Sequence, residues 1–406
     1  MIKKRIEQLR EKFKYLNIQG YVVPKNDEFF SEYAVKDRLN IISNFSGSAG
    51  LAIILKLKNY LFVDGRYTIQ AKKESGNNFK IIEIHKTLPY KVIKNIKLGF
   101  DPSLFTKKQL EFLFKKSVNL VPINANLIDQ IYKTKIYKTK PFFSLDDKVV
   151  GESFKSKISK ISKYLKKYKS DYLFISAPEN VAWILNIRGN DNPNSPIPNC
   201  HLIISSKKKI FLISSKKKTV KIINSKKIQS NYIFENNEFS NLIKRLKGKK
   251  FIIDAKSCSI SNEKIIKSNF KVLKKDDPCY EFKSIKNPVE INHMKNAHFE
   301  DGLALTKFIF WIKKINKKKI TEVDAQIKLE KFRKKSNKYL YPSFETIAGA
   351  GANGAIVHYR ARKKNCRIIR KNDIFLCDSG GQYKYGTTDV TRTICFTKPI
   401  PSIKNI

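Results

Sequence analysis

The same order of helix and strand patterns occurs twice along the chain, and this repeat constrains the fold more than any other feature of the sequence. Apolar residues recur every three or four positions over residues 2–16, as in an amphipathic helix, and residues 21–23 form a strand pattern. The same order returns at residues 158–165 and 172–175. Helices and strands that alternate this closely are typical of α/β layers, so we predict two related α/β domains.

A short motif accompanies each copy of this pattern. Residues 44–47 read Asn-Phe-Ser-Gly and residues 186–189 read Asn-Ile-Arg-Gly, and each motif lies between an apolar segment and a strand pattern. Asn-x-x-Gly is common in turns, so the matching context, and not the motif alone, supports the repeat. We also expect Gly20 to cap the opening helix, and the basic residues 133–141, which end in proline, to link the two domains.

A different pattern begins at residue 287, where we expect a third domain. Asn287, Pro288 and Glu290 have the order of a helix cap with a capping box, and a long helix should run from there to about residue 314. A second helix is predicted near residues 322–335. Strand patterns follow at residues 344–347, 356–359, 374–377 and 391–396.

The composition indicates a globular protein with a large excess of lysine. Of 406 residues, 41% are hydrophobic, and 82 basic against 35 acidic side chains give a formal net charge of +47. The lysines are spread over the whole chain in short runs between apolar stretches, which is typical of solvated loops and faces. We therefore predict no specific nucleic-acid partner, and a basic nucleic-acid-binding protein is the alternative that the charge alone supports.

Cysteine spacing and hydropathy favour a cytoplasmic protein without a membrane partner. The six cysteines include no Cys-x-x-Cys pair, and a chain of this length needs no disulfides, so reduced thiols are expected. Residues 1–16 are amphipathic and lack the apolar core of a signal peptide. No stretch approaches the roughly 20 apolar residues of a membrane span.

Two aspartates near the end of the chain are the strongest candidates for chemistry. Asp378 ends an apolar strand pattern, where a carboxylate without a partner is costly, and Asp389 lies among threonines on a returning strand. Carboxylates on adjacent strands converge, so a divalent cation could bind there. The structural alternative is that one aspartate caps a turn and the other makes hydrogen bonds of the kind found at a helix N-terminus, and spacing alone does not decide between the metal site and this alternative.

The residues around both aspartates resemble the first metal-ligand motif of the aminopeptidase P family. The matching segments are Asp-Ser-Gly-Gly-Gln-Tyr at residues 378–383 and Gly-Thr-Thr-Asp-Val-Thr-Arg-Thr at 386–393. Upstream, residues 349–359 resemble the family's substrate-histidine motif, with Ala352 where the family usually has proline. Further matches follow in order, so the resemblance covers essentially the whole chain; they lie at residues 45–50, 62–67, 181–189 and 286–290.

This resemblance implies the fold of the family's long, three-domain form. Two creatinase-like α/β domains would be followed by a pita-bread α+β catalytic domain. On this chain, we expect the N-terminal creatinase-like domain at residues 1–140, the second at 141–285, and the pita-bread domain at 286–406.

The resemblance also implies a metal-dependent Xaa-Pro aminopeptidase, which removes the first residue from peptides with proline in second position. Asp378 would bind one of two divalent metal ions and Asp389 would bridge both. The ions are commonly manganese, and they would generate hydroxide at neutral pH and polarise the scissile carbonyl. His358 would bind substrate and take part in catalysis, and Arg66 would reach substrate across a homodimer. The structural alternatives are a hydrogen-bonded strand histidine and a surface arginine that follows a turn.

The family's remaining ligands, one histidine and two glutamates in downstream motifs, have no counterpart here. Seventeen residues follow Asp389, and none is His, Asp or Glu. We therefore expect a C-terminally truncated member with an incomplete pita-bread domain that is inactive alone. The alternative is a non-catalytic pita-bread binding protein, although the retention of Asp378, Asp389 and His358 speaks against it.

Three glycines also have the Gly-x-Gly-x-x-Gly spacing of a dinucleotide-binding loop, at Gly349, Gly351 and Gly354. That fingerprint needs a strand before it and a helix after it. Residues 355–359 have a strand pattern instead, so we do not expect nucleotide binding.

We expect the positive charge to give only weak, sequence-independent binding to DNA or RNA. Contacts with phosphates release counterions, so the affinity should fall steeply between about 50 and 200 mM salt. Fluorescence anisotropy with two labelled oligonucleotides of unrelated sequence, measured over a salt series, checks this. Tight binding at physiological salt with a clear sequence preference would contradict the prediction.

Overall fold

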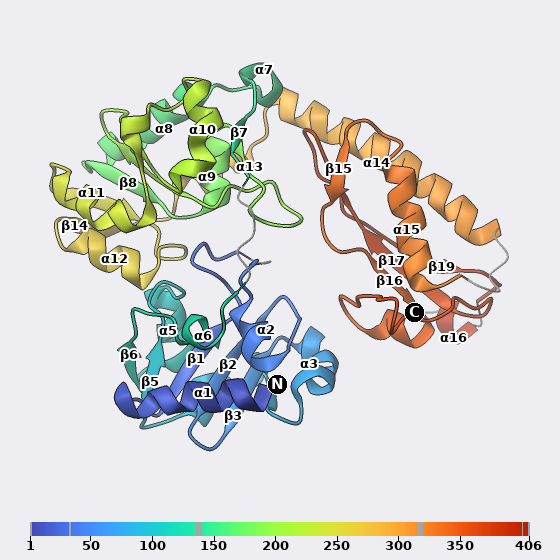
Figure 1. Ribbon diagram of the computed structural model, residues 1–406. Helices are drawn as coiled ribbons and strands as arrows, with labels where there is room; N and C mark the ends of the chain where they lie inside the picture. The colour runs from blue at the N-terminus through green and yellow to red at the C-terminus, as the bar shows by residue number, and fades with distance from the viewer. Residues whose placement is uncertain (1, 32–33, 135–139, 315–319, 400, 405–406) are drawn as a thin grey trace. The chain divides into compact units, whose positions relative to one another are not determined.

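The computed structural model describes residues 2–31, 34–134, 140–314, 320–399 and 401–404. The chain divides into two compact units, Met1–Ile285 and Lys286–Ile406 (Figure 1). Two six-stranded sheets lie in the first unit, and the second unit combines long helices with sheets of three and two strands.

The first sheet has the strand order β4-β3-β2-β1-β5-β6. Its strands are β1 (Gly20–Pro24), β2 (Gly50–Leu55), β3 (Asn59–Val63), β4 (Lys80–Glu83), β5 (Lys97–Phe100) and β6 (Asn119–Pro122). The helices around it are α1 (Ile2–Tyr15), α2 (Arg38–Ser43), α3 (Thr68–Ser75), α4 (Pro89–Val92), α5 (Lys107–Phe114) and α6 (Leu127–Ile131), with a 3-10 helix at Gly65–Tyr67.

Apolar side chains are buried on both faces of this sheet, which is why its central strands are apolar throughout. Tyr21 and Val23 of β1 belong to the core that contains α1, α2 and α6, whereas Val22 belongs to the core that contains α5. Successive side chains of a strand point to opposite faces, so a strand covered on both sides carries no polar face. Strands β2 and β3, which are consecutive in the chain, pair antiparallel as a hairpin.

The second sheet has the strand order β12-β11-β10-β8-β13-β14. Its strands are β8 (Tyr172–Ile175), β10 (His201–Ser205), β11 (Ile210–Ile213), β12 (Ile233–Phe234), β13 (Lys250–Ile253) and β14 (Lys271–Lys274), and a separate ribbon joins β7 (Phe143–Ser144) to β9 (Ile187–Arg188). The helices are α7 (Asp147–Val150), α8 (Phe154–Lys167), α9 (Pro178–Leu185), α10 (Lys216–Asn224), α11 (Phe239–Arg245), α12 (Ile260–Lys267) and α13 (Pro278–Ser284), with 3-10 helices at Ser230–Tyr232 and Asn236–Glu238.

The two sheets have the same topology, which confirms the predicted pair of related α/β domains. In the first, β1 pairs antiparallel with β2 and parallel with β5; in the second, β8 pairs antiparallel with β10 and parallel with β13. The shared Asn-x-x-Gly motif has a physical basis. Asn44 ends α2 and Asn186 ends α9, both in the left-handed conformation, with φ of 61° and 51°. Asparagine tolerates this conformation better than other residues with a side chain.

One predicted boundary in the first unit is wrong. The opening helix ends at Tyr15, and Gly20 begins β1 instead of capping the helix. The chain leaves the helix at Asn17, which takes a left-handed φ of 48°. Most of the proposed linker at residues 133–141 falls on residues 135–139, which lie outside the described residues.

The second unit begins with two helices, α14 (Pro288–Lys314) and α15 (Glu322–Arg333). The predicted capping box is confirmed: Asn287 N donates to Glu290 Oε2 and Glu290 N donates to Asn287 Oδ1, both at 3.0 Å. Strands β16, β17 and β19 form one sheet in that order, and β15 pairs with β18. Their bounds are β15 (Tyr339–Pro342), β16 (Ile347–Ala350), β17 (Ile374–Ser379), β18 (Gly381–Tyr383) and β19 (Val390–Cys395), with a 3-10 helix at Gly351–Ala355 and α16 (Pro401–Lys404).

Two of the four predicted strands in this unit are confirmed, as β17 and β19, and two are wrong. Most of residues 344–347 lie in the connection between β15, which ends at Pro342, and β16, which begins at Ile347. Residues 356–359 form a turn, because His358 takes a left-handed φ of 55° that no strand accommodates.

A buried ion pair joins the helices of this unit to its strands. Arg333 Nε donates to Asp301 Oδ1 at 2.7 Å and Arg333 Nη2 to Asp301 Oδ2 at 3.2 Å, and both side chains are 1% exposed. Arg333 Nη2 also donates to Ser379 Oγ at 3.0 Å, and Tyr383 OH donates to Asp301 Oδ1 at 2.9 Å. One network therefore connects α14, α15, β17 and β18.

We expect Arg333→Met to destabilise the second unit by about 3–5 kcal/mol, because it leaves the carboxylate of Asp301 buried without a cation. Lys334→Met is the matched control. Its exposed side chain pairs with Glu330 at 3.4 Å, and its loss should cost less than about 1 kcal/mol. Urea unfolding of the two variants checks this, and equal midpoints for the two would contradict it.

Candidate metal and substrate site

The two sequence-predicted metal ligands lie at the ends of neighbouring strands, although Asp389 was expected on the returning strand and lies one residue before it. Asp378 is in β17, where it pairs across the sheet with Thr391 of β19. Asp389 directly precedes β19, and Ser379 pairs with Val390, so the two carboxylates lie at the same end of the strand pair. Asp378 is half-buried and Asp389 is exposed.

Glycine at the end of β17 allows the turn that brings these residues together. A Cβ atom on Gly380 would lie 2.0 Å from Thr388 O and 2.2 Å from Ser343 Oγ, so no other residue fits without moving the backbone. Ser343 Oγ donates to Thr388 O at 2.9 Å, and Gly381 N donates to Thr388 Oγ1 at 2.9 Å. These bonds hold the segment before Asp389 against the end of β17.

The electrostatics of the pair suit a cation. Partial desolvation, and then the nearby charge of Asp378, raise the pKa of Asp389 above its usual range. Thr391 Oγ1 donates to Asp378 Oδ1 at 2.8 Å, which keeps that carboxylate oriented. Two acidic groups that repel each other at one place are what a hard or borderline divalent ion neutralises.

The pair is a partial ligand set. Among the described residues, no group of three or more His, Cys, Asp or Glu side chains could hold a metal ion. Asp378 and Asp389 therefore fit a metal as two of its ligands, and water or other groups would have to complete the coordination.

His358 lies in the same unit, in the segment that joins the 3-10 helix Gly351–Ala355 to the rest of the domain. It is half-buried and has left-handed backbone geometry. Glu322, which the sequence analysis did not single out, is fully buried beside this segment and accepts hydrogen bonds from Ala350 N and Tyr359 OH, both at 2.8 Å. A glutamate at the start of a helix looks like an ordinary capping residue, so no sequence signal distinguishes it.

The glycine-rich segment before His358 does not have the geometry of the dinucleotide fingerprint. A strand, β16, precedes it, but Gly351–Ala355 is a 3-10 helix and Gly351 takes a left-handed φ of 54°. The predicted strand after it was wrong, as described above. Gly349 lies so close to Gly354 that a Cβ atom on it would be 2.9 Å from the Gly354 backbone.

Arg66 lies in the other unit, Met1–Ile285, and its surroundings are described within that unit. Its backbone N and Nε donate to Asp64 Oδ1 at 3.0 and 2.8 Å, and His85 Nε2 lies 3.1 Å from Asp64 Oδ2. The hydrogen bonds from Arg66, followed by that from His85, hold the pKa of Asp64 well below its usual range. Asp64 and His85 also line a pocket of about 350 Å³.

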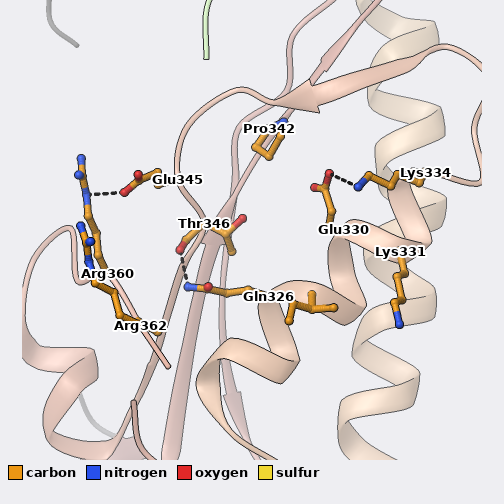
Figure 2. Close-up of a pocket in the computed structure, with 11 residues that line it drawn as sticks. Gln326, Glu330, Lys331, Lys334, Pro342, Glu345, Thr346, Arg360 and Arg362 are labelled. Carbon is orange, nitrogen blue, oxygen red and sulfur yellow. Dashed lines mark hydrogen bonds and ion pairs between the residues drawn. The ribbon is translucent and has the colours of Figure 1, made fainter. Parts of the chain in front are cut away.

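A second pocket, of about 560 Å³, lies beside α15 (Figure 2). Arg360 Nε pairs with Glu345 Oε2 at 2.8 Å, and Gln326 Nε2 donates to Thr346 O at 2.8 Å across it. Asp378, Asp389 and His358 are not among its lining residues, so this pocket is separate from the predicted metal ligands. No helix among the described residues is long and apolar enough to cross a membrane.

Three family matches cover nearly the whole chain. Residues 5–131 and residues 134–290 each match a creatinase/prolidase N-terminal domain. Residues 292–406 match metallopeptidase family M24.

Curated relatives match over nearly the full length of this chain. A probable Xaa-Pro aminopeptidase P of Coprinopsis cinerea is 32% identical over 98% of the chain and 69% of its own length. Xaa-Pro aminopeptidase 1 of Dictyostelium discoideum is 34% identical over 98% of the chain and 68% of its own length. A probable Xaa-Pro aminopeptidase P of Laccaria bicolor is 33% identical, with 97% of the chain and 65% of that protein covered. The chain thus spans about two thirds of the length of these relatives.

A solved structure agrees with these matches. The X-prolyl aminopeptidase of Caenorhabditis elegans, described as a cytosolic enzyme with a di-nuclear active site, aligns with 99% of this chain and 71% of its own. The TM-score is 0.89 and the sequence identity is 27%. With two creatinase N-terminal domains followed by an M24 pita-bread domain, the chain belongs to the Xaa-Pro aminopeptidase P family.

Proposed function

We propose that this chain carries the substrate-binding and first metal-binding segments of an aminopeptidase that releases the N-terminal residue from peptides with proline in second position. The observation that carries the proposal is the pair Asp378 and Asp389, which lie at one end of two adjacent strands in a domain of a metallopeptidase family. The family match supports the reaction class. The position of the two aspartates at one end of the strand pair supports a metal site there.

Asp378 and Asp389 would hold two divalent ions, proposed to be Mn²⁺, with Asp389 shared between them. When bound, such ions supply hydroxide at neutral pH and polarise the scissile carbonyl. Thr391 keeps the carboxylate of Asp378 oriented through its 2.8 Å hydrogen bond, and the turn at Gly380 sets the separation of the two aspartates. Their roles as ligands rest on the matching motif and on this geometry.

His358 and Arg66 would act on the substrate. His358 can donate or accept a hydrogen bond at a peptide carbonyl or amide, and we propose that it binds substrate and stabilises the transition state. Arg66 offers a guanidinium that Asp64 orients, suited to a carbonyl or a terminal carboxylate. On the family resemblance of residues 62–67, we propose that it reaches substrate across a homodimer.

We propose domain limits at residues 1–140, 141–285 and 286–406, and a cytoplasmic location. All six cysteines are free, which fits a reducing compartment, and the C. elegans protein is described as cytosolic. We also propose that residues 1–406 do not hydrolyse peptides alone, because two carboxylates cannot complete the coordination of two ions. A non-catalytic binding role is the alternative, and measurements of peptide hydrolysis and of Mn²⁺ binding distinguish it from the proposed peptidase.

Activity should appear when the missing ligands are supplied. We expect a chimera, in which residues 1–406 are followed by the segment of the C. cinerea relative beyond its match to this chain, to cleave Xaa-Pro peptides with Mn²⁺. It should not cleave Xaa-Ala analogues, whose amide nitrogen carries a hydrogen that the proline nitrogen lacks. Chromatography of the released amino acid measures this. Equal turnover of both peptides would reject the substrate class, and chelator-sensitive turnover by residues 1–406 alone would show that the ligand set is misassigned.

Metal binding can be measured without any activity. Asp378→Asn and Asp389→Asn should each weaken Mn²⁺ binding to the 406-residue chain by about tenfold or more, because each removes one of two charged ligands. Asp373→Asn is the matched control, since this aspartate accepts a 2.8 Å hydrogen bond from Arg370 N in the same unit. Isothermal titration calorimetry reports the affinity and circular dichroism the fold. Wild-type affinity in both ligand variants would refute the assignment.

A further inference from the structure

The unit that carries His358 contains a fully buried carboxylate, Glu322, whose partners all lie around the His358 segment. Glu322 is the first residue of α15 and is 0% exposed. Its helix lies beside β16, the strand that leads into that segment (Figure 1). A carboxylate in such a place is costly unless each oxygen is well hydrogen-bonded.

The carboxylate oxygens of Glu322 accept hydrogen bonds from four residues. Oε1 accepts from Ala350 N at 2.8 Å, and Oε2 accepts from Tyr359 OH at 2.8 Å and from Arg367 N at 2.9 Å. Asn353 Nδ2 lies 3.1 Å from both oxygens. Ala350 and Tyr359 are the two ends of residues 350–359, so one side chain ties both ends of the segment together.

The chemistry of the site calls for a carboxylate in particular. An ionised carboxylate only accepts hydrogen bonds, whereas an amide of the same shape would point an N–H group at one set of these donors. The partial positive charge at the start of α15 favours the anion further. Burial, and then the bond to Glu322, raise the pKa of Tyr359, so its hydroxyl stays a donor at neutral pH.

His358 has a backbone conformation that needs this support. Its φ is 55°, in a region that few residues with a side chain adopt. Such conformations persist when the surrounding structure determines them, and they occur often at functional sites. His358 directly precedes Tyr359, whose hydroxyl also accepts from Asn353 Nδ2 at 2.9 Å, so the support acts next to the strained residue.

We propose that Glu322 is a positioning residue: its buried carboxylate holds residues 350–359 in the turn that presents His358 to the substrate. The proposal rests on the substrate role proposed above for His358. It differs from a general stabilising role, because it places the effect of Glu322 on the conformation of one segment and one histidine.

The test compares Glu322→Gln with Glu330→Gln in the 406-residue chain. Glu330 is on the same helix and accepts a 2.6 Å hydrogen bond from Tyr339 OH, so the control makes the same chemical change at a carboxylate bonded outside residues 350–359. We expect amide exchange over residues 350–359 to become about tenfold faster or more in Glu322→Gln and to stay unchanged in Glu330→Gln. Hydrogen exchange with mass spectrometry measures this segment beside the rest of the unit.

The ring of His358 gives a second readout. The chain has five histidines, so the ring signals are few, and His358→Gln identifies the one that belongs to residue 358. We expect that signal to shift or broaden in Glu322→Gln. Tyr359→Phe, which keeps the carboxylate and removes one donor, should give a smaller change in the same direction and covers the case in which Glu322→Gln fails to fold.

Two outcomes would overturn the proposal. One is an unchanged His358 signal and unchanged exchange over residues 350–359 in both Glu322→Gln and Tyr359→Phe. The other is faster exchange spread evenly over the whole unit, which would assign Glu322 to general stability. Neither readout uses peptide hydrolysis, so an inactive chimera would remove the proposed function and leave this result standing.

Discussion

The second unit depends on the ion pair between Asp301 and Arg333. Its two charges are 1% exposed and come from α14 and α15, and its hydrogen bonds reach Ser379 at the end of β17 and Tyr383 in β18. Such a pair adds little net stability over apolar side chains, but it stabilises one arrangement strongly because either charge alone is costly. Ser379 follows Asp378, so the network that joins the helices to the strands also anchors the strand end that bears the first proposed metal ligand.

Four acidic residues in this unit have different roles because their burial and their hydrogen-bond partners differ. Asp301 pairs with the guanidinium of Arg333, and this ion pair joins the two helices. Glu322 is matched by neutral donors and holds a segment in a turn. Asp378 and Asp389 face each other with fewer donors, which leaves them suited to an external cation. The buried carboxylates with protein partners have structural roles, and a metal site is proposed at the more exposed pair.

The first unit contains two sheets that pack in the same way. Both sheets have apolar strands covered on both faces, and both repeat the same order of parallel and antiparallel pairs. The left-handed asparagines that end α2 and α9 sit at equivalent positions because the chain must leave each helix sharply to begin the next segment. The lysine-rich composition is compatible with this packing, because the buried residues of both sheets remain apolar.

The sequence by itself determined the two α/β domains, the two long helices and the strands that bring Asp378 and Asp389 together. These depend on local patterns: apolar periodicity, a capping box and a glycine turn between strands close in sequence. Only the tertiary structure decided the left-handed turn at His358, the place of Glu322 and the network of Arg333. The partners of the Glu322 carboxylate lie 28 to 45 residues away along the chain, from Ala350 to Arg367. Those of Arg333 lie 32 and 46 residues away, at Asp301 and Ser379. A local pattern carries no information about contacts at that separation, and the free energy that favours them arises only once the helices and strands have packed.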